Sequence, residues 1–98
     1  MKHFYVIGWQ DGDMATCKLG FTGDIPRRLV QLQVGNPTKL YLFATSLVSN
    51  AVRFEKFVHK AYSDKRIRGE WYRLGWSDLQ LLYDNMDNAK QECSCNEC

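Results

Sequence analysis

Two apolar segments on either side of an Asp-Gly turn constrain the fold of this chain more than any other feature. Residues 3–9 are rich in Phe, Tyr, Val and Ile, which favour strands. Residues 15–21 form a second segment of similar length. Asp11-Gly12 lies between the two, and this dipeptide is a strong signal for a tight hairpin turn. We therefore predict an antiparallel β-hairpin at the start of the domain.

The following residues alternate between helix and strand signals. Asp24 can cap a helix with Pro26 in its first turn, and Gly35-Asn36-Pro37 ends that helix. Residues 40–48 have the length and composition of a third strand. Two more helices are expected at about 51–62, capped by Ser49-Asn50, and from Ser77-Asp78 to about 89, with a short extended segment at 70–74. The order β-β-α-β-α-α predicts an α+β fold with a small three-stranded antiparallel sheet flanked by helices.

The size of the chain favours one domain. It has 98 residues, of which 45% are hydrophobic and 24% charged, a globular composition. We assign residues 1–90 to this domain and 91–98 to a Cys-rich C-terminal tail. No apolar run approaches the roughly 20 residues that span a bilayer, and no secretion signal follows Met1. We expect a soluble cytoplasmic protein with no membrane partner.

Positive charge is concentrated in the middle of the chain. The net charge is only +2, but residues 18–73 contain 11 Lys or Arg and four Asp or Glu. Residues 74–98 contain one Lys and five acidic residues. Such a basic middle suits a polyanion-binding surface, although an ordinary solvated surface is the alternative.

Four short motifs follow in a characteristic order. They are Phe4-Tyr5-Val6 in the first strand, Lys18-Leu19-Gly20 in the second, Arg28 eight residues after Gly20, and Glu55 on a later helix. This set resembles the GIY-YIG nuclease superfamily, with Lys18 where a tyrosine usually stands. The lysine, the segment 54–60 and Gly69-Glu70-Trp71-Tyr72 are most similar to the phage-associated branch typified by a phage T-five orf-172-like domain. The resemblance covers residues 4–75 and implies a GIY-YIG-like fold and phosphodiester cleavage.

The same residues have suitable chemistry for this reaction. Lys18 could accept a proton from water or orient it, and Tyr5 could share that proton or hold the water. Arg28 offers a planar fork for phosphate oxygens near a helix N-terminus. Core packing remains the alternative for Tyr5, an ion pair with an acidic neighbour for Lys18, and a solvated helix position for Arg28.

Glu55 is the predicted ligand of one Mg²⁺ or Mn²⁺ ion, because one carboxylate with water and phosphate is a usual arrangement for Mg²⁺. His59 lies one helical turn later and could bind phosphate, carry a proton or hold Glu55, or be an ordinary surface histidine. Glu70 is expected to have a structural role, paired with Arg66 or Arg68, rather than a place near the metal. Eight basic residues could follow a nucleic-acid backbone: Arg27, Lys39, Arg53, Lys56, Lys60, Lys65, Arg66 and Arg68.

The tail holds three cysteines in compact spacing, Cys93, Cys95 and Cys98. A closed zinc site needs four ligands, so His3, Cys17 or a partner chain would have to supply the fourth. Free thiols are the alternative.

The sequence thus predicts a metal-dependent endonuclease acting on nucleic acid, with DNA favoured over RNA. The alternative is a catalytically inactive module of the same fold that binds nucleic acid or inhibits a host protein.

Overall fold

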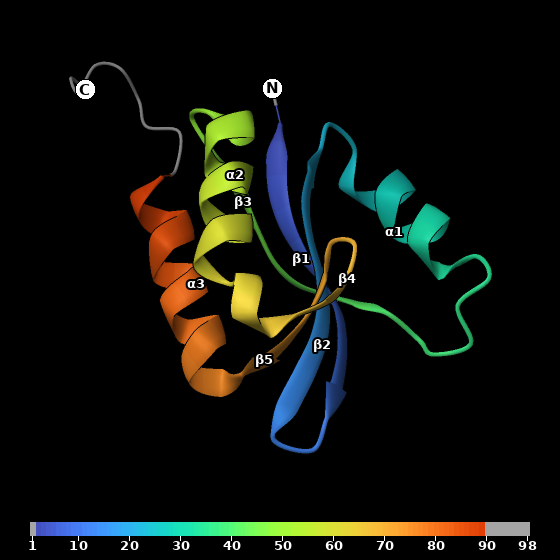
Figure 1. The fold of residues 1–98 in the computed structure, drawn as a ribbon. Helices are drawn as coiled ribbons and strands as arrows, with labels where there is room; N and C mark the ends of the chain where they lie inside the picture. Colours follow the sequence, from blue (N-terminus) through green and yellow to red (C-terminus); the bar gives the residue numbers. More distant parts are fainter. Residues whose placement is uncertain (1, 90–98) are drawn as a thin grey trace.

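The computed structural model describes residues 2–89, which form an α+β fold with a five-stranded antiparallel sheet and three α-helices (Figure 1). The predicted fold class is confirmed. The elements in chain order are β1 (His3–Asp11), β2 (Met14–Thr22), α1 (Ile25–Gln33), β3 (Tyr41–Leu47), α2 (Ala51–Ala61), a 3-10 turn (Ser63–Lys65), β4 (Arg66–Arg68), β5 (Trp71–Gly75) and α3 (Trp76–Asn88). The strand order across the sheet is β3-β1-β2-β5-β4.

The predicted hairpin forms the centre of this sheet. β1 and β2 pair along their whole length, from His3 opposite Thr22 to Asp11 opposite Met14. Gly12 in the connecting turn has a φ of +63°, a conformation that glycine adopts without steric cost. Most residues of both strands are buried, because neighbouring strands and helices surround the hairpin.

The predicted strand number is wrong, since the sheet has five strands rather than three. β5 overlaps the segment expected to be extended and continues one residue beyond it, to Gly75, and it pairs with β2. β4 was expected to be a basic loop. All three of its residues are exposed, so it has no apolar face that a sequence pattern could reveal.

Helices cover the sheet on opposite sides. In Figure 1, α2 and α3 lie next to each other on one side and α1 lies on the other. Successive strand residues point to opposite faces, so Phe4 and Val6 pack in the core below α2 and α3. Tyr5 and Ile7 pack in a smaller cluster with residues of α1. The sheet therefore separates two apolar layers.

The helix starts agree only partly with the prediction. Asp24 caps α1 by accepting from the Arg27 N–H at 3.1 Å, and Asn50 caps α2 in the same way. Ser77 was a wrong choice of cap for α3, because this helix begins at Trp76 directly after β5. The Asp78 carboxylate instead accepts from the Gly75 N–H at 3.0 Å, as a first-turn residue.

One irregularity of the sheet determines where the site lies. β5 pairs only with Met14 to Lys18, so the second half of β2 has no strand partner on that side.

No described helix has the length and apolar character that a bilayer crossing requires. The predicted zinc ligands Cys93, Cys95 and Cys98 lie outside the described residues.

Candidate active site

Side chains from α2 and from the β4–β5 turn meet at the unpaired half of β2. The Leu19 N–H donates to the Glu70 carbonyl at 3.0 Å, directly after β5 ends its pairing with β2. The Leu19 carbonyl lies 3.3 Å from Nε2 of His59 on α2. Since a carbonyl only accepts, Nε2 carries the hydrogen, and Nδ1 keeps the lone pair in the neutral ring. The Leu19 backbone thus holds the Glu70 backbone through its N–H and the His59 ring through its carbonyl.

Three side chains form a cluster that could hold a cation. Glu55, His59 and Glu70 each place one ligand atom so that these atoms lie within 4.8 Å of one another. All three side chains are partly exposed, so the cluster is accessible from solvent. Two carboxylates provide the hard oxygen ligands that Mg²⁺ and Mn²⁺ prefer. The donor set therefore fits the predicted metal.

Lys18 lies next to this cluster. Its ammonium group is 3.5 Å from Oε1 of Glu70, and its side chain is 19% exposed. The same ammonium group is 5.7 Å from the centre of the Trp71 ring. Lys18 therefore adds a positive charge beside two carboxylates. The ion-pair partner of Glu70 is Lys18, not Arg66 or Arg68 as predicted.

Tyr5 and Glu70 converge above Gly20. Tyr5 is opposite Gly20 in the β1–β2 pairing, and its residue is only 2% exposed. A methyl group on Gly20 would lie 2.9 Å from the Tyr5 hydroxyl and 3.4 Å from Oε1 of Glu70. The space that Gly20 leaves is thus occupied by two polar groups of the site. Burial raises the pKa of Tyr5; the charge of Arg28 acts to lower it, and the charges of Glu70 and Glu55 act to raise it further.

Arg28 lies on α1, close enough to act electrostatically on Tyr5. Its Nε is buried and has no hydrogen-bond partner among residues 2–89. Few N–H groups are left for an anion at the start of α1, because Asp24 accepts from the N–H groups of Arg27 and Arg28 and Pro26 has none. The Arg28 guanidinium is therefore the main anion-binding group of this segment.

The pKa of Glu55 is raised, first by burial and next by the negative charge of Glu70. His59 and Lys18 act in the opposite direction. Two carboxylates that repel each other in a partly buried place are a common feature of cation sites, because a bound cation removes the repulsion.

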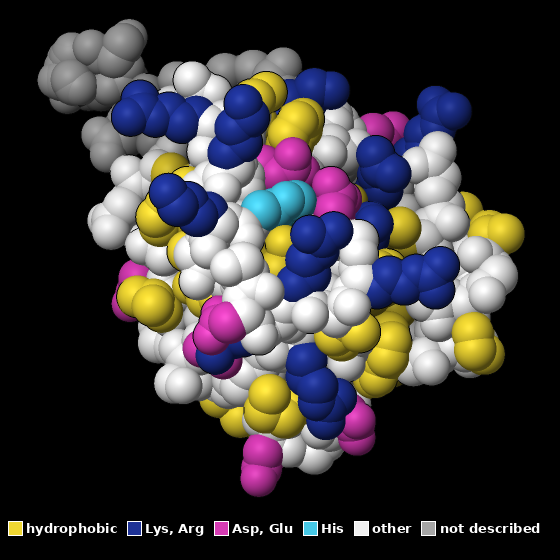
Figure 2. Space-filling view, in the orientation of Figure 1, with side chains coloured by type: hydrophobic (Ala, Val, Ile, Leu, Met, Phe, Trp, Pro, Cys, Tyr) yellow, Lys and Arg dark blue, Asp and Glu magenta, His cyan; other side chains and the backbone are white. Residues whose placement is uncertain are grey.

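Basic side chains surround the cluster. Figure 2 shows Lys and Arg groups around a histidine that lies against acidic side chains. Seven of the eight predicted backbone-binding residues are exposed: Arg27, Lys39, Arg53, Lys56, Lys60, Arg66 and Arg68. Lys65 is less available, since it lies 3.7 Å from Asp64 and 3.8 Å from Asp78. Lys39 lies over the Tyr41 ring, in a different cavity from the one that contains Lys18.

The structure thus brings together the five predicted catalytic residues: Tyr5, Lys18, Arg28, Glu55 and His59. Glu70 was expected to be structural, but its side chain lies in the cluster. The glycine at position 69 is the sequence signal for this placement. Gly69-Glu70 forms a two-residue turn between β4 and β5, and Gly69 has a φ of +56°, which glycine adopts without steric cost. Cys17 is a poor candidate for a fourth zinc ligand, because it is buried in the core and burial raises its pKa to about 12.

Fold and geometry together define a small α+β domain with a solvent-accessible acidic cluster surrounded by cations. A family model described as the T5orf172 domain matches residues 2–93, so the chain belongs to the T5orf172 domain family. That family is associated with nuclease-related domains, which makes the chain a nuclease-like or nucleic-acid-binding module. The comparison with curated proteins and the comparison with solved structures each found no match.

Proposed function

We propose that this protein is a divalent-metal-dependent endonuclease of the GIY-YIG type that hydrolyses phosphodiester bonds, with DNA as the favoured substrate. The observation that carries the proposal is the cluster of Glu55, His59 and Glu70, whose ligand atoms lie within 4.8 Å of one another beside Lys18. The family supports it at the level of nuclease-related domains.

Glu55 and Glu70 would hold one Mg²⁺ or Mn²⁺ ion. When bound, the ion would act as a Lewis acid that lowers the energy of negative charge on the phosphate and the leaving oxygen. His59 is the less suitable ligand for an oxygen-preferring ion, and this leaves its imidazole free for proton transfer.

His59 is the proposed proton acceptor. Its Nε2–H is held by the Leu19 carbonyl, which orients the ring and leaves Nδ1 with a lone pair. As the oxygen of water forms its bond to phosphorus, the proton of this water passes to Nδ1. The bond between phosphorus and the leaving oxygen breaks, and that oxygen takes a proton from solvent. Lys18, which the sequence offers as a proton acceptor or a water-orienting group, lies 3.5 Å from the Glu70 carboxylate and is better suited to stabilise phosphate charge.

Tyr5 and Arg28 complete the proposed mechanism. Because burial raises the pKa of Tyr5, its hydroxyl keeps its proton at neutral pH and can donate to the attacking water or to a phosphate oxygen. The Arg28 guanidinium can bind a second phosphate oxygen as a fixed planar cation. The exposed basic residues of α1, α2 and β4 would hold the flanking backbone.

A plasmid-cleavage assay tests the proposal. We expect nicking or cutting with Mg²⁺ or Mn²⁺, and none with EDTA. Glu55→Gln and Arg28→Ala should each reduce the rate about 10²-fold or more. Asp84→Asn is the matched carboxylate control, since Asp84 is exposed on α3, and it should retain the wild-type rate. Salt-sensitive binding without cleavage under either ion would contradict the nuclease and leave a nucleic-acid-binding module.

A further inference from the structure

A groove with aromatic walls leads away from the candidate active site. One cavity, about 560 Å³ in volume, is lined by Lys18 and Glu70 of that site and also by Trp71 and Trp9. A second cavity, about 730 Å³ in volume, is lined by Trp9 and continues to Tyr41 on the edge strand β3. Since Trp9 lines both cavities, they adjoin at this ring. We call the two together the aromatic groove.

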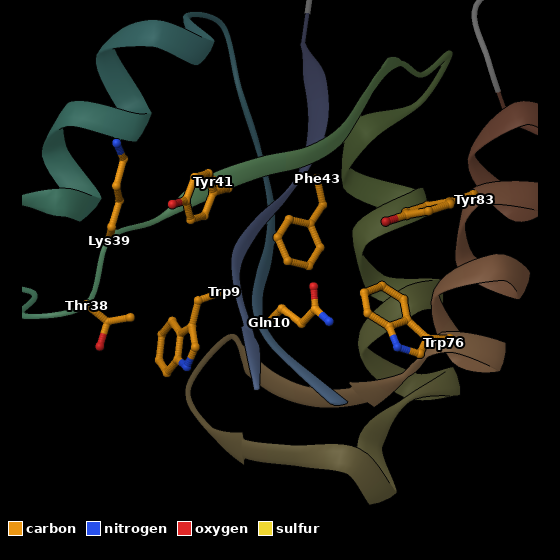
Figure 3. Close-up of a pocket in the computed structure, with 8 residues that line it drawn as sticks. All are labelled: Trp9, Gln10, Thr38, Lys39, Tyr41, Phe43, Trp76 and Tyr83. Carbon is orange, nitrogen blue, oxygen red and sulfur yellow. The ribbon is translucent and has the colours of Figure 1, made fainter. Parts of the chain in front are cut away.

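Aromatic rings line the aromatic groove, and a lysine lies over a ring near each end of it. The Trp71 and Trp9 rings are 5.8 Å apart between centroids, and Lys18 lies over Trp71. At the other end, the Lys39 ammonium group is 5.6 Å from the centre of the Tyr41 ring. Figure 3 shows Lys39 beside Tyr41, and Gln10 between the rings of Trp9 and Trp76. Tyr41 is 54% exposed, so its ring is available to a ligand.

These features suit unpaired nucleotides. Bases of a single strand expose faces that stack on aromatic rings, and cations along the same path neutralise the phosphates. The charged side chains lining the aromatic groove are Lys18, Lys39, Arg68 and Glu70, and Glu70 is already paired with Lys18. A duplex keeps its bases stacked inside and offers no such face.

We propose that the aromatic groove binds a single-stranded segment of nucleic acid next to the phosphate that is cut, so that substrates with unpaired nucleotides are preferred over a fully paired duplex. The statement about the cut phosphate rests on the proposed nuclease function, whereas binding in the aromatic groove does not. Bases would stack on Tyr41, Trp9 and Trp71 in that order towards Lys18.

Binding in EDTA separates this proposal from cleavage. The probe is a fluorescein-labelled oligothymidylate, which cannot pair with itself, and a hairpin duplex of equal length is the comparison. Fluorescence anisotropy at fixed salt should show tighter binding of the oligothymidylate. Tyr41→Ala and Trp9→Ala should each weaken it about 10-fold or more, with little effect on the duplex. Phe57→Ala is the matched control, because Phe57 is an exposed ring on α2 that lines neither cavity, and its affinity should equal that of wild type.

Equal affinity for duplex and single strand, or unchanged oligothymidylate affinity in Tyr41→Ala, would overturn the proposal. If Trp9→Ala fails to fold, Tyr41→Ala alone decides, since its exposed ring contributes little to the core. A protein that binds the oligothymidylate through these rings but cuts nothing with Mn²⁺ would support the aromatic groove and refute the nuclease. A protein that cuts duplex plasmid with no single-strand preference would support the nuclease and refute the role of the aromatic groove.

Discussion

Gly20→Ala should impair the site without disrupting the fold. Gly20 lies on β2 opposite Tyr5, and a methyl group there points at the Tyr5 hydroxyl and the Glu70 carboxylate. Neither neighbour is backbone, so the strand pairing itself can persist. Tyr5 is nonetheless packed in the apolar layer under α1 and cannot simply turn away.

The size of the effect follows from the contact distance. The new methyl carbon would be 2.9 Å from the Tyr5 oxygen, whereas ordinary contact begins at 3.4 Å, so the hydroxyl must move by about 0.5 Å. A misplacement of about 1 Å in a catalytic site can cost about 10²-fold in rate, so we expect a loss of about 10-fold. The overpacking should cost about 1 kcal/mol of unfolding free energy, at the low end for such changes.

The assay is plasmid cleavage with Mn²⁺, combined with thermal unfolding. Gly75→Ala is the matched control, since a methyl group there meets only atoms at 3.6 Å, and it should cut like wild type. If the loss acts through the hydroxyl, Gly20→Ala should reduce the rate much less in a Tyr5→Phe background than in wild type. Full activity of a folded Gly20→Ala protein would refute the placement of Tyr5 in the mechanism.

Two further predictions concern ionisation. Burial and Glu70 raise the pKa of Glu55, so the folded protein favours the protonated acid. The stability that this group contributes is therefore present below its ordinary pKa of 4.5, and it is lost as the pH rises through the pKa of the folded protein. The Glu55→Gln variant should therefore unfold at a higher temperature than wild type at pH 7 in metal-free buffer. This difference in unfolding temperature should shrink towards zero below pH 4.5. A lower unfolding temperature of the variant at pH 7 would contradict this reasoning. Because burial raises the pKa of Cys17 to about 12, iodoacetamide at pH 8 should leave Cys17 unmodified in the native protein and alkylate it in guanidinium, as measured by peptide mass spectrometry. Rapid native alkylation of Cys17 would show that the core around it opens.

The sequence predicts the central elements because each carries a local signal. The Asp-Gly turn defines the β1–β2 hairpin, and Asp24 and Asn50 are side-chain caps that act within their own helices. β4 lacks such a signal, because its three residues are exposed and its pairing with β5 depends on tertiary position. The start of α3 was misplaced since Gly75, its N-cap, has no side chain to mark it.

The residues of the candidate site likewise differ in whether the sequence predicts them. Tyr5, Lys18, Arg28 and Glu55 were selected by their order and spacing along the chain, and the fold brings them together. The sequence favours a structural role for Glu70, because Arg66 and Arg68 are the cations nearest to it along the chain. Its actual partner, Lys18, lies across the β2–β5 pairing, which sequence distance does not reveal.

In the proposed mechanism, the short β5 strand would allow groups from both faces of the sheet to reach one phosphate. If β5 continued to pair beyond Lys18, its backbone would occupy the Leu19 carbonyl, and His59 would have no anchor there. Instead, the Gly69-Glu70 turn immediately precedes β5 at this point, and the Glu70 side chain lies close to that of Glu55. α2 can then contribute Glu55 and His59 from one side, while Tyr5 and Arg28 act from the side of α1. An added residue in this turn should therefore separate Glu70 from Lys18 and weaken the cluster, even though every predicted catalytic residue remains in place.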